Sequence, residues 1–130
     1  MSDENTNNND FSHEIIGAAV EVQRVLGTGL PEAVYAAALE IELAEREIGF
    51  ARNVPVAASY KGLSLGEVCR AAFVVEQSVV VEVRAVDALT DLHRVQAQAA
   101  VRLSGLRLGL LINFNVFPVV KGVHRIGVKP

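Results

Sequence analysis

The sequence predicts an α/β domain in which helices flank a mixed β-sheet with a central hairpin. Residues 70–75 and 79–86 are rich in valine and are separated only by the polar residues 76–78, so we expect two strands joined by a tight turn. Two helical segments precede this hairpin, and a third helical segment separates it from an apolar strand at residues 106–114. Because that third helix allows a crossover connection, the sheet is expected to be mixed and covered by helices.

The first two helices are delimited by capping and breaking residues. Ser12 is expected to cap the first helix, which ends at Gly27, and Pro31 suits the first turn of the second, which is expected to run to Gly49. The buried stripe of the first helix follows at spacings of four, three and four residues, and it consists of Ile15, Ala19, Val22 and Leu26. Helix one therefore has a clear inner face.

The strands before the hairpin are predicted from alternation. Apolar residues recur at every second position in much of the segment 50–60, which predicts a strand. Pro55 within this segment favours an edge position or a bulge, because proline has no N–H to donate to the ladder. Lys61 and Gly62 form a turn, after which residues 63–75 supply the strand that leads into the hairpin. Residues 123–128 are a plausible last strand.

The third helix is expected to begin at Thr90, its N-cap, and to end at Gly105. Its inner stripe is predicted to be Leu92, Val95, Ala99 and Leu103. His93 in the first turn has no second histidine or acid at ligand spacing, so it is interpreted as a solvated or hydrogen-bonded residue.

Two charged residues interrupt the second strand of the hairpin. Side chains alternate across a strand, so Glu82 and Arg84 share one face with Val80, while Val79, Val81 and Val83 share the other. If residues 76–78 form the turn, Ala72 pairs with Glu82, and Arg70 with Arg84. An acid at position 72 would complete a carboxylate pair suited to a divalent cation, but the residue there is alanine.

Several segments resemble one known family. They are EVR at residues 82–84 with its ten-residue offset from Ala72, GLPEAVY at 29–35, IIGAA at 15–19, YKG at 60–62 and GLLINF at 109–114. Together they look like the GxxExxY proteins of the PD-(D/E)XK nuclease superfamily, over about residues 15–126. The resemblance implies a restriction-endonuclease-like core.

The resemblance also implies a degenerate nuclease site. Its positions are the helix glutamate Glu32, Ala72 in place of the metal-binding aspartate, the second acid Glu82, Arg84 in place of lysine, and Gln96 with Ala100 in place of a Gln-x-x-x-Tyr pair. A guanidinium does not deprotonate in proteins and cannot act as a general base, so Glu82 and Arg84 are interpreted as a structural ion pair. From the residues alone, Glu32 has a second interpretation, as an acid that complements the helix dipole.

Composition limits the remaining possibilities. The 130 residues suit one domain, predicted at residues 12–130, after an acidic, Asn-rich tail of residues 1–11 that is expected to be disordered or loosely attached. With 51% hydrophobic residues but no apolar run near ~20 residues and no signal-peptide pattern, we expect a cytoplasmic protein without a membrane span. The single Cys69 is interpreted as a core residue without a chemical role.

Charge argues against nucleic acid as a partner. The net charge of −3 arises from three acids in the tail, and the rest of the chain is neutral, without the basic excess expected of a protein that grips phosphates. No cofactor or metal is expected, and Mg²⁺ enters only if residual nuclease activity survives.

The helices carry few charges, which favours association. Residues 33–39 and 95–101 contain no charged residue, and such faces are normally covered. The hypothesis is a catalytically inactive, self-associating structural or scaffolding homo-oligomer or filament, with a candidate interface formed by Ala33, Ala36, Ala37, Ala97 and Ala100. A residual Mg²⁺-dependent nuclease and a non-cutting nucleic-acid-binding module are the alternatives.

Overall fold

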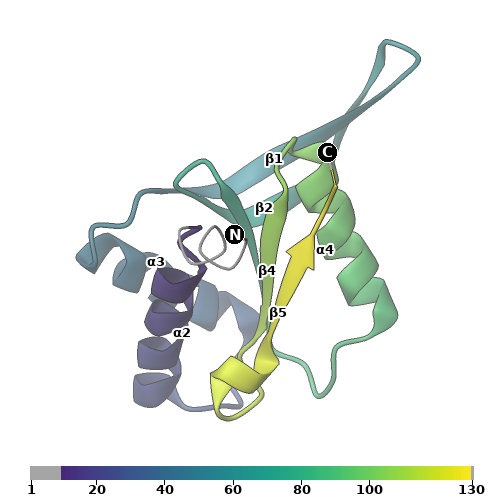
Figure 1. Cartoon of the computed structure of the whole chain (residues 1–130). Coiled ribbons are helices and arrows are strands. Elements are labelled where there is room, and N and C mark those ends of the chain that lie inside the picture. Colours follow the sequence, from purple (N-terminus) through teal and green to yellow (C-terminus); the bar gives the residue numbers. More distant parts are fainter. Residues whose placement is uncertain (1–9, 130) are drawn as a thin grey trace, which may run out of the picture.

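The predicted α/β class is confirmed by a computed structural model, which describes residues 10–129. Its five-stranded mixed sheet has the order β1-β2-β3-β4-β5, in which only β3 and β4 are parallel neighbours. Helices α2 and α3 pack on one face of the sheet and α4 on the other, so the fold has three layers (Figure 1). In chain order the elements are α2 (Ser12–Leu26), α3 (Glu32–Glu45), β1 (Phe50–Tyr60), β2 (Leu63–Val75), β3 (Val79–Arg84), α4 (Asp91–Leu103), β4 (Leu108–Asn113), the 3₁₀ turn η1 (Val119–Gly122) and β5 (Val123–Gly127).

The central hairpin has the predicted turn but pairs over a shorter length. Its register includes Phe73 with Val81 and Val75 with Val79, in agreement with a turn at residues 76–78. The ladder ends at Phe73, so the predicted pairing of Ala72 with Glu82, and of Arg70 with Arg84, is wrong. β3 continues in parallel pairing with β4 while β2 turns away with β1. The two strands of the hairpin therefore diverge.

Beyond this divergence, β1 and β2 form a two-stranded arm that projects from the sheet (Figure 1). β1 is an edge strand, which confirms the position inferred from Pro55, and register shifts follow at Val56/Ala57 and Ala58/Ser59. Lys61 and Gly62 form the predicted turn, both with positive φ.

Three helix boundaries agree with the sequence and two do not. Gly27 and Gly105 adopt positive φ just after α2 and α4, and the Thr90 hydroxyl caps α4 by accepting a hydrogen bond from the His93 N–H. His93 completes a capping box, since its Nδ1 accepts from the Thr90 N–H.

The two differences have local causes. Ser12 lies inside α2 and does not cap it, because its hydroxyl accepts a hydrogen bond from Arg125 and the preceding Asp10 carboxylate accepts from the Ser12 N–H. Helix α3 ends at Glu45 rather than near Gly49, because Glu47 adopts φ 59° and redirects the chain.

The inner face of α4 differs from the predicted stripe. Leu92 and Val95 are 63% and 57% exposed, whereas Ala97, Ala100 and Val101 are buried against the sheet. Close approach to the sheet explains this choice, because a Cβ added at Gly109 would lie 2.5 Å from Val101 Cγ2. Small side chains pack inward where the helix contacts β4, and the larger ones remain outside.

The candidate interface is corrected by the same packing. Ala36, Ala97 and Ala100 are between 2% and 6% exposed and belong to the protein's own core, so they are not available to another subunit. Ala33 and Ala37 on α3 are exposed.

The core beneath α2 and α3 joins the two ends of the chain. The predicted stripe of α2 is buried there, and the Tyr35 ring stacks on Phe114 with centroids 4.9 Å apart. The Tyr35 hydroxyl donates to the Gly27 carbonyl, so it anchors the α2–α3 loop as expected.

The start of the described chain is also anchored. Residues 1–9 of the predicted loose tail lie outside the described residues. Asp10 and Phe11 were included in that tail, but Asp10 forms an ion pair with Arg125 at 2.8 Å and Phe11 packs against the core. Between residues 10 and 129, no helix is long and apolar enough to cross a membrane.

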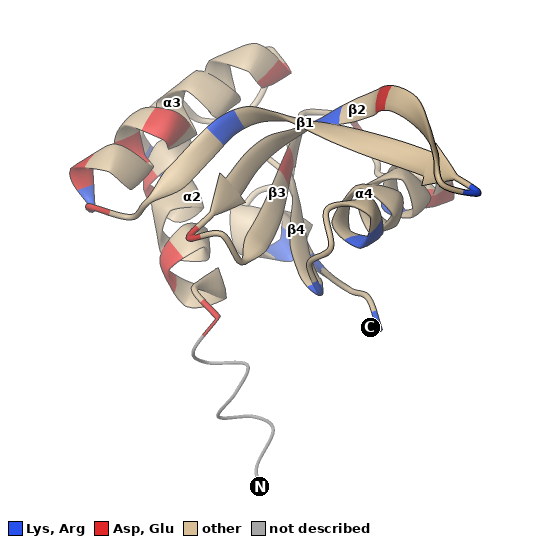
Figure 2. Ribbon diagram, turned by 90° about the horizontal axis from the view of Figure 1, so that it is seen from above, with Lys and Arg blue, Asp and Glu red and all other residues tan. Residues whose placement is uncertain are grey.

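Charges are separated along the chain, although they nearly cancel. Residues 10–49 contain eight acidic and two basic residues, residues 50–90 are neutral, and residues 91–129 contain one acidic and six basic residues. Since the first segment forms α2 and α3, most of the acidic side chains lie in one layer (Figure 2). The basic excess belongs to α4 and the strands that follow it.

Gln23 should contribute strongly to stability. Its buried amide donates to the carbonyls of Phe114 and Val116 and accepts from the Val119 N–H. Gln23→Ala would leave these backbone groups without partners, so we expect the free energy of unfolding to fall by ~2–4 kcal/mol. Urea denaturation measures this change, with the exposed Gln98→Ala as control, and equal stability of the two variants would contradict the assignment.

Candidate functional site

The candidate site lies where β2 and β3 diverge. Two neighbouring cavities occupy this fork, one of about 310 Å³ toward α3 and one of about 400 Å³ beneath α4. They share Arg70, Glu82 and Arg84 as lining residues. The fork thus connects the two helical layers.

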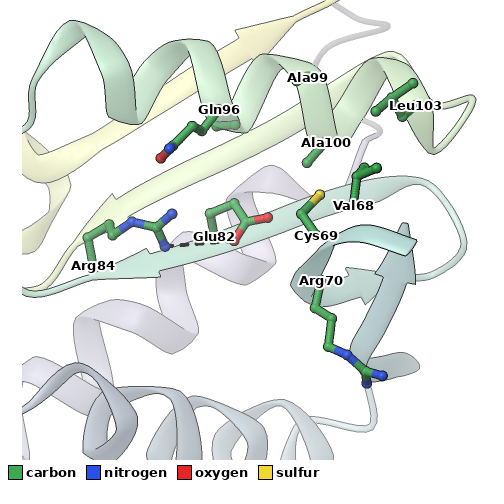
Figure 3. A pocket seen from close by; sticks show the side chains of 10 residues that line it. Val68, Cys69, Arg70, Glu82, Arg84, Gln96, Ala99, Ala100 and Leu103 are labelled. Atoms are coloured by element: carbon green, nitrogen blue, oxygen red, sulfur yellow. Dashed lines mark ion pairs between the residues drawn. The ribbon is translucent and has the colours of Figure 1, made fainter. Parts of the chain in front are cut away.

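All six positions inferred from the family resemblance line these cavities. Glu32 and Ala72 line the cavity toward α3, and Gln96 and Ala100 line the cavity beneath α4, while Glu82 and Arg84 line both. Figure 3 shows Gln96 and Ala100 on α4, facing Glu82 and Arg84 on β3. Positions that are up to 68 residues apart in the sequence, from 32 to 100, therefore meet at one place.

Burial controls the chemistry of Glu82. The residue is 7% exposed and lies on β3, which pairs with β4 at this point. Burial raises the pKa of Glu82 to about 7, although Arg84 and a hydrogen bond with the Ala72 backbone oppose the rise and Glu32 adds to it. Glu82 therefore changes protonation near neutral pH.

Arg84 lies between two carboxylates. Its Nη1 is 3.8 Å from Glu82 Oε1 and 3.9 Å from Glu32 Oε2, and it donates a hydrogen bond of 2.9 Å to the Val83 carbonyl. The pair inferred from the sequence is therefore present as an ionic contact, with Glu32 as an additional partner. Because both distances exceed hydrogen-bond length, the attraction is electrostatic.

Sequence reasoning missed two residues of this site and misplaced a third. Arg52 and Asn53 on β1 line the cavity toward α3, and Arg52 Nη1 donates to the Ala72 carbonyl at 3.2 Å. Arg70 was expected opposite Arg84, but it contacts Glu67 and its side chain points away from Glu82 (Figure 3). Asn53 adopts φ 53°, and the Asn preference for this region was the available signal.

Cys69 and His93 both have defined surroundings, since Cys69 borders the cavity beneath α4 and the His93 ring accepts a hydrogen bond from the Thr90 N–H. Cys69 is half-buried on β2, packs against the core beneath α4, and has its pKa raised mainly by burial. The part of the chain that the structure describes contains no group of three or more His, Cys, Asp or Glu side chains placed to hold a metal ion.

The mixed sheet and its flanking helices are consistent with a nuclease-type α/β fold, and comparison with protein families agrees. A family model for the PD-(D/E)XK nuclease superfamily matches residues 9–126. The chain belongs to this superfamily. No curated protein and no solved structure matches the chain.

Glu82 should make stability depend on pH. Its pKa is about 7 in the folded protein, against 4.5 for an unperturbed glutamate, so the folded state binds more protons between these limits. The free energy of unfolding should therefore fall as pH rises from about 4.5 to 7. The full effect corresponds to about 3 kcal/mol, and it should be absent in Glu82→Gln.

Urea denaturation across this pH range tests the assignment. Glu47→Gln serves as the control, because it removes an exposed carboxyl group that lines neither cavity of the fork. Parallel pH profiles for the wild type and Glu82→Gln would mean that another group causes the dependence.

The ion pair should show non-additive energetics. At pH 9, where Glu82 is ionised, Arg84→Met would leave a buried carboxylate beside Glu32, and we expect a loss of ~3 kcal/mol of stability. The double variant with Glu82→Leu removes both charges and should be closer to the wild type. Thermal melting of both variants measures the difference, and identical melting temperatures would mean that solvent already screens the pair.

Proposed function

We propose that the chain is a catalytically inactive PD-(D/E)XK domain of the GxxExxY type that acts as a self-associating structural or scaffolding protein. The observation that carries the loss of catalysis is the position of Arg84 between Glu82 and Glu32. A permanent guanidinium charge there offsets part of the negative charge of the two carboxylates and repels a divalent cation.

The residues at the fork do not fit a bound Mg²⁺. Ala72 offers a methyl group where the family resemblance places an aspartate, and its carbonyl already accepts from Arg52. Glu82 has a pKa of about 7, so protons compete with a metal for this carboxylate at neutral pH. A second cation would also lie close to the Arg84 charge.

Self-association is supported by apolar side chains that remain on the outside of all three helices. Val25 on α2, Ile41 on α3 and Leu92 on α4 are each more than 60% exposed. Larger sets of exposed apolar side chains are typical of association surfaces. Exposed apolar side chains on three helices suit binding to another protein surface, and the partner that we propose is a second copy of this chain.

A cleavage assay tests the loss of catalysis. The wild type should leave DNA and RNA intact with Mg²⁺ or Mn²⁺ present, and Mn²⁺ at millimolar concentration should shift its melting temperature by less than about 1 °C. Cleavage that disappears with chelator and with Glu82→Ala would show an active nuclease and refute the proposal.

Restoring the family pattern provides the matched experiment. Ala72→Asp with Arg84→Lys returns a second carboxylate and removes the guanidinium, so Mn²⁺ should now raise the melting temperature by several degrees. Ala72→Asn with Arg84→Lys is the control, because asparagine has the same shape without the charge. Equal shifts in the two variants would mean that charge at position 72 does not decide metal binding.

A further inference from the structure

We infer that copies of this chain associate head to tail, with the outer surface of α4 of one copy docked on the outer surface of α3 of the next. The inference rests on the proposed self-association and specifies its contact. Two rows of side chains define the surfaces. The α3 row, which is Val34, Ala37, Ile41 and Ala44, is exposed. The α4 row, which is Leu92, Val95, Ala99 and Leu103, is exposed except at the half-buried Ala99, and its last two residues also border the cavity beneath α4.

The rows match in length and differ in shape. Each extends over 11 or 12 helical residues, or about 15–17 Å at the rise of an α-helix. The α3 row contains two alanines, one between Val34 and Ile41 and one after Ile41. The α4 row presents larger Leu and Val side chains at three of its four positions. Small residues on one helix allow the large residues of another to approach closely.

The charges beside the rows are of opposite sign. Helix α3 carries four glutamates and no basic residue. Glu32, Glu40 and Glu42 contact arginines of the same copy, and the fourth, Glu45, lies next to the α3 row and is exposed. Helix α4 carries Arg94 and Arg102 against the single Asp91, and Arg107 follows it. A contact between two copies of α3 would oppose like charges, whereas α3 on α4 brings opposite charges together.

The positions of the two helices dictate how such a contact propagates. Because α3 and α4 cover opposite faces of the sheet, a copy bound through its α4 still presents its α3 (Figure 1). A contact between different surfaces repeats, and it gives a closed ring or an open filament according to whether the rotation closes. The same arrangement explains why large side chains occur on the outside of α4.

Two blocked variants test this geometry. Ile41→Glu places an unpaired carboxylate in the centre of the α3 row, and Val95→Glu places one in the centre of the α4 row, so each variant puts a charge into the apolar contact. Both positions are more than half exposed, so the fold should persist, which circular dichroism checks. Light scattering over a concentration series should find each variant monomeric where the wild type assembles.

The mixture of the two variants is the decisive sample. Ile41→Glu retains an intact α4 and Val95→Glu an intact α3, and the two blocked rows carry like charges, so a 1:1 mixture should form heterodimers and nothing larger. Heterodimers would also show that both variants are folded. A mixture that stays monomeric, or that assembles as far as the wild type, would refute the head-to-tail contact.

Two further measurements distinguish this contact from an interface elsewhere on the molecule. Leu65→Glu is the matched control, because Leu65 is 62% exposed on the β1–β2 arm, away from both rows. It should assemble like the wild type, and its loss of assembly together with normal assembly of the other two variants would place the interface on the arm. Raising salt from 50 to 500 mM should increase the concentration for half-assembly about tenfold, because screening weakens the charge contribution.

The test also distinguishes failure of the contact from failure of the proposed function. A wild type that remains monomeric at every concentration refutes self-association itself. An oligomer that persists in both blocked variants leaves self-association standing and refutes the contact between α3 and α4. Assembly that requires an added 20-base-pair DNA duplex would show that nucleic acid, bound through the basic residues of α4 and the strands after it, joins the copies. That result also refutes the contact.

Discussion

The divergence of β2 from β3 is the constraint on which the site and the arm both depend. β3 pairs with β2 only as far as Phe73 and Val81, while its pairing with β4 continues to Arg84 and Asn113. The part of β3 that has lost its partner on one side carries Glu82 and Arg84, and these side chains fill the fork between two helical layers. β2, once separated, remains paired with β1 alone and extends as the arm. One change of strand pairing thus creates a polar opening in a sheet that is otherwise covered by apolar side chains.

A polar opening of this kind is costly unless its charges are compensated. Glu82 is desolvated, and the consequence is a pKa near 7 rather than the ordinary value of a carboxyl group. Arg84 supplies the opposite charge, but at 3.8 Å and without a hydrogen bond its attraction offsets the desolvation only in part. In a metal-dependent relative the compensating charge would be a divalent ion held by two carboxylates. In this chain the cation beside Glu82 is the covalently attached guanidinium of Arg84, which cannot dissociate.

Much of this arrangement could be predicted, and the failures have a common origin. Local signals located the strands β1 and β2, the Thr90 cap and the turn at residues 76–78, because each of these features depends on neighbouring residues in the sequence. The six positions inferred from the family resemblance lie along one fork in the structure. Where the prediction failed, a distant contact decided the outcome. Ser12 hydrogen-bonds Arg125 instead of capping its own helix, and Arg52 reaches the site from a neighbouring strand. No pattern within one segment specifies such contacts.

Helix α4 shows why hydrophobic periodicity alone could not identify its inner face. Two faces of the helix are apolar, one with large side chains at Leu92 and Val95 and one with small side chains at Ala97 and Ala100. A count of hydrophobicity favours the first, but Gly109 on β4 brings the helix so close to the sheet that only the second fits. The large side chains are then left outside, on the layer with the basic excess. The net charge of the chain also gives no sign of this basic excess, because the acidic excess of residues 10–49 cancels it. Complementary surfaces on opposite sides of one molecule therefore arise from packing and chain order together, although the composition is that of an ordinary neutral domain.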